Sequence, residues 1–409
     1  MMSRKERSRM ELFSRIKAGE LTRRRAAGLL RLSYRQTLRM YDRYAAGGAA
    51  GLTHGLRGKA SNHRRDPKHR ARVLALYRKT YCGFGPTLAA EQMLEREKVL
   101  VDHETLRRWL SAEGLWKGSR QRQQHRSRRP RRSCRGELVQ LDGSPHAWLE
   151  GRGPRMSLIE FVDDATSLAY GRFYPEETTE AVMDCFERYI RQRGVPRALY
   201  VDKDSIYVVN NREPTGKEIL ENQEPLTQFG RACGELDVTI IPADSPQAKG
   251  RVERVHGTHQ DRLCKLLRLE QIDTMVDANA YLERKYWAAY NGRFSKPPGE
   301  AADLHRKLPA GMDLDQVLCL KEQRTVGRDW CVSYQRRVLQ IGARHQSLGL
   351  AGQKLELRQH LDGRLTLHFH GRELEHEELN VRAAKERPRP VFKNREAYKP
   401  SAQHPGGRM

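Results

Sequence analysis

Five short β-prone runs between residues 136 and 244 constrain the fold of this chain more than any other feature. The first three follow one another closely, and helical segments separate the later ones. The runs are GELVQLDG, MSLIEFVDD, LAYGRFY, RALYVDKD and VTIIPAD. Three consecutive strands followed by alternating helices and strands indicate a mixed, five-stranded sheet with helices packed on it. The sequence therefore predicts a central α/β domain.

Two helices are expected to cover this sheet. The first, residues 178–194, carries apolar side chains at helical spacing, namely Val182, Phe186, Tyr189 and Ile190. The second runs from about Ala248 to Leu267, and its inward stripe consists of Val252, Val255, Leu263 and Leu266. Side chains three and four residues apart share one face of a helix, so each helix has one apolar side to bury.

Three acidic residues occupy positions at which distant segments of such a fold can meet. Asp142 ends the first run, Asp202 follows the fourth, and Glu253 lies early in the second helix. Carboxylates at neighbouring strand ends and on an adjacent helix form an all-oxygen site, which suits Mg²⁺ or Mn²⁺. Two such ions activate a nucleophile and stabilise a leaving oxygen in phosphoryl transfer. We predict that the three acids are catalytic and bind two Mg²⁺ or Mn²⁺ ions.

Other residues near these acids have competing interpretations. Asp163 and Asp164 end the second run and are expected to bind backbone where the strand turns. His256, one turn after Glu253, is expected to be a surface histidine, with orientation of a phosphate or a metal-bound water as the alternative. Lys249 and Arg254 flank Glu253 and are candidates to hold phosphate groups of a substrate.

The charge of the chain is concentrated in its first third. The formal net charge is +25, and residues 1–135 contain 35 Lys and Arg against 11 Asp and Glu. A solvated surface usually mixes both signs, so this imbalance indicates a polyanionic partner. Neutralising several phosphates gives tight and salt-sensitive binding, which makes double-stranded DNA the expected partner.

Two helix-turn-helix patterns lie within the basic region. In the first, Thr22 and Ser33 are placed to cap two short helices, and Arg35 and Arg39 would share the exposed face of the second helix. A helix of this kind enters the major groove.

In the second pattern, Pro86 begins one helix and Asp102 caps the next, on which Arg107 and Arg108 would be exposed. A basic segment without acidic residues follows at 117–135, and it is expected to be disordered until it lies along phosphates. Its candidate contacts are Arg128, Arg129, Arg131 and Arg132.

Beyond a Pro- and Gly-rich boundary near residue 305, short strand signals resume, with Asp362-Gly363 as a hairpin turn. We expect a small β-barrel there, followed by a disordered basic tail. No apolar stretch is long enough to span a bilayer, and the seven cysteines form no Cys-x-x-Cys pair. These features favour a cytosolic protein that is associated with the nucleoid, and they argue against a membrane partner, a zinc finger or a disulfide framework.

The succession LVQLDGSPHAWLEGRGPRMSLIEFVDDATS, YVDKDSIY and SPQAKGRVERVHGTHQDRL resembles the integrase-core DDE transposases of bacterial insertion sequences, and the ISNCY type in particular. The resemblance implies a ribonuclease-H-like core, two divalent ions, and strand cleavage and transfer at terminal inverted repeats. It assigns the catalytic acids to Asp142, Asp202 and Glu253. Asp204 departs from the family pattern and is a rival to Asp202. The separation of Asp202 from Glu253, with 50 residues between them, is longer than the integrase pattern.

The resulting expectation is a multidomain DNA transposase that acts as a homo-oligomer, because two element ends must be held together. The expected domains are two helix-turn-helix units at 1–50 and 66–116, a linker at 117–135, the core at 136–305, the barrel at 306–380 and the tail at 381–409. Two alternatives stay open: a metal-dependent endonuclease or phage-type integrase with the same core, and a DNA-binding regulator derived from an inactive transposase.

Overall fold

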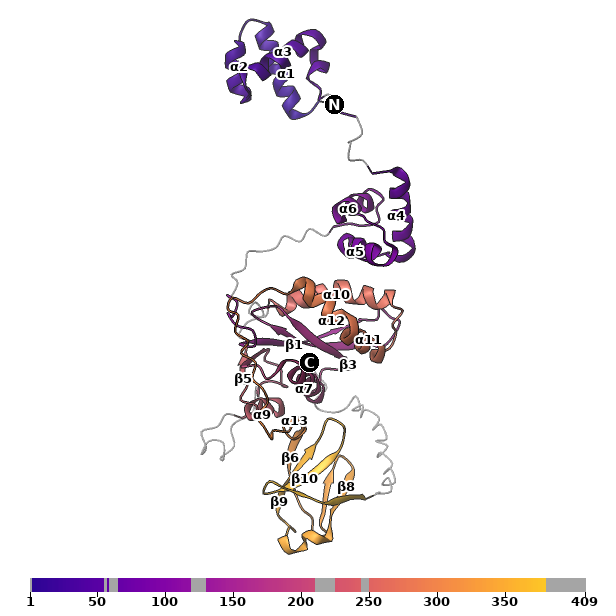
Figure 1. Ribbon diagram of the computed structural model, residues 1–409, viewed down its shortest axis with the longest axis vertical. Coiled ribbons are helices and arrows are strands. Elements are labelled where there is room, and N and C mark those ends of the chain that lie inside the picture. Colours follow the sequence, from indigo (N-terminus) through magenta and orange to yellow (C-terminus); the bar gives the residue numbers. More distant parts are fainter. Residues whose placement is uncertain are drawn as a thin grey trace, which may run out of the picture. The chain divides into compact units, whose positions relative to one another are not determined.

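The computed structural model describes residues 2–54, 57–58, 65–118, 130–209, 225–243 and 250–379. The chain divides into two compact units, Met1–Lys117 and Gly118–Met409 (Figure 1). Three of the predicted segments lie wholly or partly outside the described residues: the tail, most of the basic linker, and the stretch immediately before the second core helix. Among the described residues, no helix combines the length and apolarity that crossing a bilayer requires.

The first helical group of the N-terminal unit contains the first predicted helix-turn-helix. Its elements are α1 (Arg4–Lys17), α2 (Arg23–Leu30), α3 (Tyr34–Gly47) and the 3₁₀ turn η1 (Gly48–Leu52). The Thr22 hydroxyl accepts a hydrogen bond from the amide of Arg25, and the Ser33 hydroxyl accepts one from Gln36, so both predicted caps are confirmed. Phe13 and Met40 are buried at the centre of the group.

The second helical group contains α4 (Pro67–Thr80), α5 (Pro86–Glu97) and α6 (His103–Ala112). Pro86 is the first residue of α5, and Asp102 caps α6 by accepting from the amides of Glu104 and Thr105, as predicted. Leu106 and Leu110 are fully buried. Their burial leaves the opposite face of α6 in solvent.

The core of the second unit is a mixed, five-stranded sheet with the order β3-β2-β1-β4-β5. Its strands are β1 (Val139–His146), β2 (Met156–Asp163), β3 (Ala169–Tyr174), β4 (Ala198–Val201) and β5 (Thr239–Pro242). Strand β2 is antiparallel to both β1 and β3, whereas β4 is parallel to both β1 and β5. The predicted mixed sheet is confirmed.

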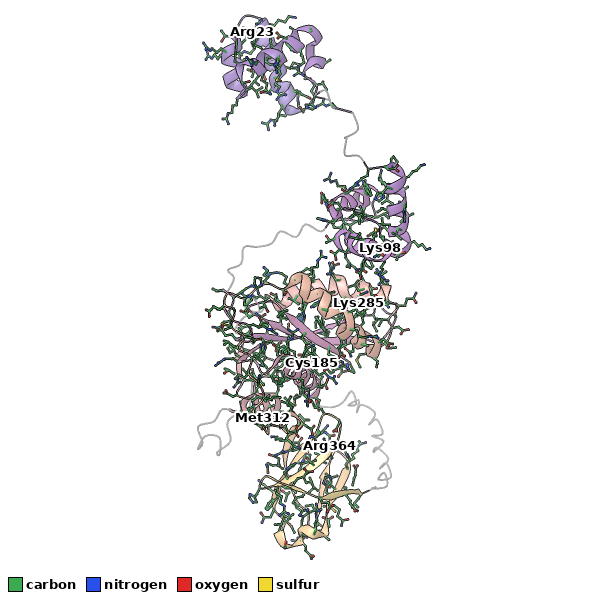
Figure 2. All side chains as sticks on the ribbon, in the orientation of Figure 1. Arg23, Lys98, Cys185, Lys285, Met312 and Arg364 are labelled. Carbon is green, nitrogen blue, oxygen red and sulfur yellow. The ribbon has the colours of Figure 1, made fainter. Side chains whose placement is uncertain are left out.

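Helices cover both faces of this sheet (Figure 1). On one face lie α7 (Thr179–Arg193) and α9 (Gln228–Glu235). The ring of Phe161 on β2 stacks there on Phe186 and Tyr189 of α7. Cys185 of α7, which is labelled in Figure 2, contacts the carbonyl of Ile159. On the other face lie α10 (Val252–Leu269), α11 (Met275–Tyr281), the π-turn η3 (Leu282–Tyr286) and α12 (Trp287–Phe294).

Side chains tie α10 to β1 at two points. The amide of Val252 donates to Oε1 of Gln140, and Nε2 of Gln260 donates to Oγ of Ser144, both at 3.2 Å. Residues two apart on a strand share a face, as do residues four apart on a helix. Asp142 and His256 therefore occupy the position between these two contacts.

The C-terminal part consists of two small antiparallel sheets, and the predicted barrel is wrong. One sheet has the order β11-β10-β9-β6 and the other β12-β8-β7. Within the described residues, no strand pairing joins the two sheets into a closed ring. Their apolar sides share one core that includes Val332, Leu339, Leu357 and Leu367. Burial is thus achieved by packing two sheets face to face, without closure.

The elements of this part begin with α13 (Leu314–Val317) and include the 3₁₀ turn η4 (Ala343–Leu348). The strands are β6 (Leu320–Thr325), β7 (Cys331–Tyr334), β8 (Arg337–Ile341), β9 (Lys354–Gln359), β10 (Leu365–Phe369), β11 (Arg372–Leu374) and β12 (His376–Leu379). The predicted turn at Asp362-Gly363 connects β9 to β10, with Gly363 at a φ of 86°.

Candidate active site

The pairing of β1 with β4 brings two of the predicted acids to the same end of the sheet. The strands run parallel, with Val139 opposite Leu199 and Gln140 opposite Tyr200. Continuing this register by two residues places Asp142 beside Asp202, which directly follows the end of β4. Both carboxylates are partly buried.

Asp204, the rival to Asp202, is exposed and takes part in a local turn. Its Oδ1 atom accepts from the amide of Ile206 at 2.9 Å, while its own amide donates to Oδ1 of Asp202 at 3.1 Å. The strand register therefore favours Asp202 as the partner of Asp142.

Glu253 stands in the first turn of α10, and its side chain is exposed. It lies three residues before His256, so about 4.5 Å of helix separates it from the residue that contacts Asp142. Among the described residues, no three His, Cys, Asp or Glu side chains are arranged to bind a metal ion together. The structure thus groups Asp142 with Asp202 and leaves Glu253 on the adjoining turn.

Glu177 lies near these acids, and the sequence did not indicate it. Its carboxylate accepts from the hydroxyl of Tyr207 at 2.9 Å and lies against Gly143, where a Cβ atom would overlap it. Burial raises the pKa of Glu177, and the charges of Asp142, Asp202 and Asp204 raise it further, against the hydrogen bond from Tyr207, which lowers it. Negative charge is therefore concentrated at this end of the sheet.

The donor atoms at this end of the sheet are of the kind that suits a divalent cation. Asp142 and Asp202 offer only carboxylate oxygens, the donors that Mg²⁺ and Mn²⁺ prefer, and Glu177 adds negative charge from beside Gly143. The repulsion between these carboxylates contributes to the raised pKa of Glu177. A bound cation would reduce this repulsion by neutralising their negative charge.

His256 is not a surface histidine, as the sequence suggested, but is 8 % exposed. Its Nδ1 atom lies 3.5 Å from Oδ2 of Asp142, and its Nε2 atom lies 3.2 Å from Oε2 of Glu160. Glu160 is completely buried and also contacts His259, whose Nε2 atom is 2.6 Å from Oε1. No local sequence pattern indicated this cluster, because it depends on the pairing of β1 with β2.

Asp163 and Asp164 have the structural role predicted for them. Asp163 accepts from the amide and the hydroxyl of Thr166 at the turn after β2. Asp164 accepts from the amide of Arg132 and from Gln140, and it forms an ion pair with Arg251. Both carboxylates are thereby engaged in holding the turn in place.

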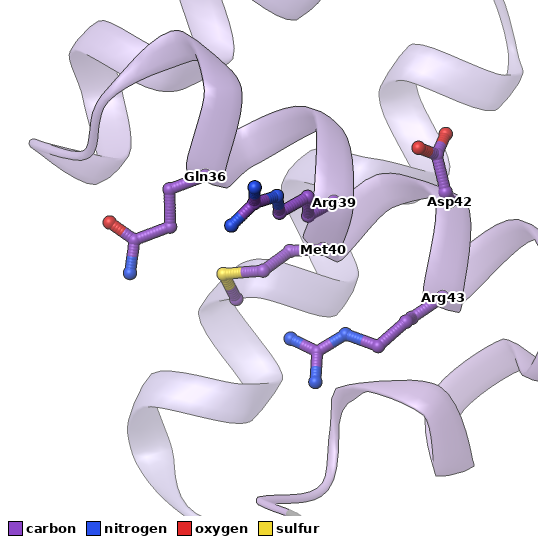
Figure 3. Close-up of a pocket in the computed structure, with 5 residues that line it drawn as sticks. All are labelled: Gln36, Arg39, Met40, Asp42 and Arg43. Carbon is purple, nitrogen blue, oxygen red and sulfur yellow. The ribbon is translucent and has the colours of Figure 1, made fainter.

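The predicted DNA-binding arginines of the two helical groups differ in their contacts. Arg35 and Arg39 are exposed on α3, and neither side chain has a hydrogen bond or ion pair within the described residues. Arg39 lines an open hollow with Gln36, Met40, Asp42 and Arg43 (Figure 3).

Arg107 and Arg108 are also exposed, but both lie against Glu104. Arg107 donates two hydrogen bonds of 2.6 Å to the Glu104 carboxylate, and Arg108 approaches it to 3.4 Å. The basic charge on α6 is therefore partly neutralised, whereas that on α3 is not.

The basic candidates around the core are placed differently from one another. Arg131 donates to the carbonyls of Asp164 and Ala165, and so binds the turn after β2. Arg132 is half exposed and pairs with Glu137, and Arg254 is exposed on α10. The other three candidates lie outside the described residues: Arg128, Arg129 and Lys249.

Comparison with known proteins identifies the family. No family model matches the chain. It is 42 % identical over 375 residues to the putative transposase y4bF of Sinorhizobium fredii, covering 91 % of this chain and 80 % of that protein. It is also 26 % identical to the transposase for insertion sequence IS1202 of Streptococcus pneumoniae, covering 79 % of this chain and 75 % of that protein. The chain belongs to the transposase family of these relatives.

Solved structures show a weaker likeness. The integrase catalytic core domain of HTLV-2 in complex with magnesium matches 37 % of this chain and 86 % of that one, at 16 % identity and a TM-score of 0.27. The match to the simian T-cell lymphotropic virus intasome in complex with a PP2A regulatory subunit covers 72 % of this chain and 95 % of that chain, at 14 % identity and a TM-score of 0.34. These scores are low, and the family assignment stands on the sequence relatives alone. The mixed five-stranded sheet that was expected for the core is present, with the order β3-β2-β1-β4-β5.

Proposed function

We propose that this protein is a DDE transposase of the ISNCY type, which binds the terminal inverted repeats of its insertion sequence and cleaves and joins DNA strands. The observation that carries the proposal is the parallel register of β1 and β4, which sets Asp142 beside Asp202 in a chain of the transposase family. Two Mg²⁺ or Mn²⁺ ions would be held by Asp142, Asp202 and Glu253. When bound, such ions activate the attacking water or 3′-hydroxyl and neutralise charge on the leaving oxygen.

The protein residues have distinct roles in this proposal. Asp142 and Asp202 bind from neighbouring strand ends, and Glu253 binds from the turn of α10 that precedes His256. Because the nucleophile is a water or a DNA hydroxyl, no side chain has to form a covalent intermediate. Glu177, anchored by Tyr207, adds negative charge that favours cation binding at the same end of the sheet.

DNA binding in this proposal falls mainly to the N-terminal unit. Arg35 and Arg39 face the major groove from α3, and Arg107 and Arg108 contact DNA from α6. Arg254, Arg131 and Arg132, with Arg128, Arg129 and Lys249, would hold phosphates near the core. Two element ends must be held together for strand transfer, so the active form is a homo-oligomer assembled on DNA.

Substitution of each acid separates catalysis from binding. Asp142→Asn, Asp202→Asn and Glu253→Gln are each expected to abolish cleavage and joining of a DNA end while leaving binding of that end intact in a mobility-shift assay. Asp261→Asn is the matched control, because Asp261 is an acid on α10 that pairs with Lys265 at the surface. Retained cleavage in any of the three variants would remove that residue from the site.

The joining reaction distinguishes a transposase from its closest alternatives. A pre-cut end carrying a free 3′-hydroxyl should be transferred into a supercoiled target plasmid in the presence of Mg²⁺. Hydrolysis without transfer would instead indicate an endonuclease, and binding without either reaction would indicate a regulator.

A further inference from the structure

A buried chain of polar side chains leads from Asp142 into the core beneath α10. Asp142 and Glu160 are directly opposite each other in the β1–β2 pairing, so their side chains share the sheet face that α10 covers. His256 lies between the two carboxylates, and His259 contacts the far oxygen of Glu160. The Nδ1 atom of His259 is in turn 2.6 Å from the hydroxyl of Tyr286.

This arrangement is costly unless its members are paired. Like charges opposite each other on a sheet repel, and a buried carboxylate loses its hydration. Burial alone would raise the pKa of Glu160, but the charge of His259, the hydrogen bond with His259 and the nearby His256 hold that pKa well below its ordinary value. Glu160 is therefore a buried anion, and each of its oxygens faces a histidine ring.

The charge of Glu160 restrains the ring of His256. If Asp142 were its only polar neighbour, the imidazole ring could turn together with the Asp142 carboxylate. Because its Nε2 atom also faces the buried Glu160 anion, the ring has one favoured orientation. The amide of Val252 donates to Gln140 and fixes the first turn of the helix, which precedes His256. Residues that are not proposed to bind the cation, Glu160 above all, thus direct Nδ1 of His256 at Oδ2 of Asp142.

We propose that His256 is a positioning residue for Asp142: its Nδ1 atom, 3.5 Å from Oδ2, restrains that carboxylate, while Glu160 and His259 hold the ring. The inference rests on the proposed function, in which Asp142 binds the cation. Residues that hydrogen-bond a metal ligand commonly contribute 10- to 100-fold to metal affinity, which sets the size of the expected effect.

Two conservative substitutions separate the two nitrogens of the ring. The amide nitrogen of an asparagine is bonded to Cγ, as Nδ1 is, so His256→Asn keeps a donor for Asp142. The amide nitrogen of a glutamine lies further out, near the place of Nε2, so His256→Gln keeps a donor for Glu160. If positioning of Asp142 is the role, only the asparagine variant restores it.

The experiment measures Mn²⁺ affinity of the full-length, DNA-free protein by isothermal titration calorimetry, alongside cleavage of a DNA end. His256→Ala should weaken Mn²⁺ binding by about 10- to 100-fold. His256→Asn should recover most of this loss and His256→Gln should not. Urea unfolding without cation, measured on every variant, verifies that each one is folded at the temperature of the titration.

Gln260→Ala is the matched control, since it removes the neighbouring contact between α10 and β1 without touching a carboxylate. It should leave Mn²⁺ affinity unchanged. The inference is overturned if His256→Ala binds Mn²⁺ as wild type does, if glutamine rescues and asparagine does not, or if Gln260→Ala weakens binding equally. If Asp142→Asn itself leaves Mn²⁺ affinity intact, the proposed metal site fails first, and the role of His256 fails with it.

Discussion

Glu104 on α6 restrains two arginines that the proposed function places on DNA, and its removal should strengthen DNA binding. The Glu104 carboxylate receives two hydrogen bonds from Arg107 and lies 3.4 Å from Arg108. In Glu104→Gln the side chain keeps its size but loses its charge, so both guanidinium groups become available to phosphates. Asp102 still caps the helix, since its carboxylate accepts from the amides of Glu104 and Thr105.

The expected magnitude follows from counterion release. Each additional phosphate neutralised steepens the slope of log K against log salt by about 0.9. Removing one negative charge beside two arginines should add about one such contact. Between 50 and 200 mM salt, the variant should then lose affinity by a factor about 3.5 times larger than the factor by which wild type loses it. At the lower salt concentration the variant should bind more tightly than wild type. Fluorescence anisotropy with a labelled duplex over this salt range measures both effects.

Glu113 provides the control for this prediction. It also holds two arginines, Arg70 and Arg78, but it lies at the opposite end of α6. Glu113→Gln makes the same change in net charge, and its salt slope should stay close to that of wild type. An unchanged slope in Glu104→Gln, or an equal change in both variants, would refute the assignment of the exposed face of α6 to DNA.

Two further predictions concern α3 and the charge around Asp142. If Arg39 reads a base edge, Arg39→Ala should weaken binding to the element end by about 1–3 kcal/mol and relax the sequence preference at one base pair. Competition against single-base variants of the end measures this preference. Equal weakening on all sequences would show that Arg39 contacts a phosphate instead. Because the pKa of Glu177 is raised in the folded protein, its ionisation destabilises the fold, and wild type loses stability as pH rises from the ordinary value of 4.5 through that raised pKa. Glu177→Gln lacks this loss of stability, so in cation-free buffer the difference between its urea midpoint and that of wild type should grow as pH rises through this interval. Below pH 4.5 the two midpoints should be equal. A difference that does not change with pH would argue against the raised pKa of Glu177.

Local signals in the sequence predicted much of the fold. The caps at Thr22, Ser33 and Asp102 are confirmed, because a cap needs only a side chain and an amide two or three residues away. The strand sequence from 136 to 244 also sufficed for a mixed sheet. A cap is encoded within a few residues, and the sheet was inferred from the order of short segments that are each recognisable on their own.

Features that depend on pairing between distant segments were missed or wrong. The C-terminal strands were recognisable, but closure of a barrel depends on which edges pair, and the structure has two separate sheets instead. His256 looked like a surface residue because its helix turn is polar in sequence. Its burial follows from Glu160 and Asp142 facing it across β1 and β2, a register that no short pattern encodes.

The contacts between α10 and β1 also determine how far these two elements can move past each other. Four residues of helix rise about 6.0 Å and two residues of strand about 6.6 Å, so successive side chains stay in step over this short length. The same contacts can therefore re-form only if the helix shifts along the strand by about one turn, which corresponds to two strand residues. A slip by one step would bring Gln260 over Asp142 and carry Glu253 out of reach, so an insertion within the segments 140–144 or 252–260 would separate these residues.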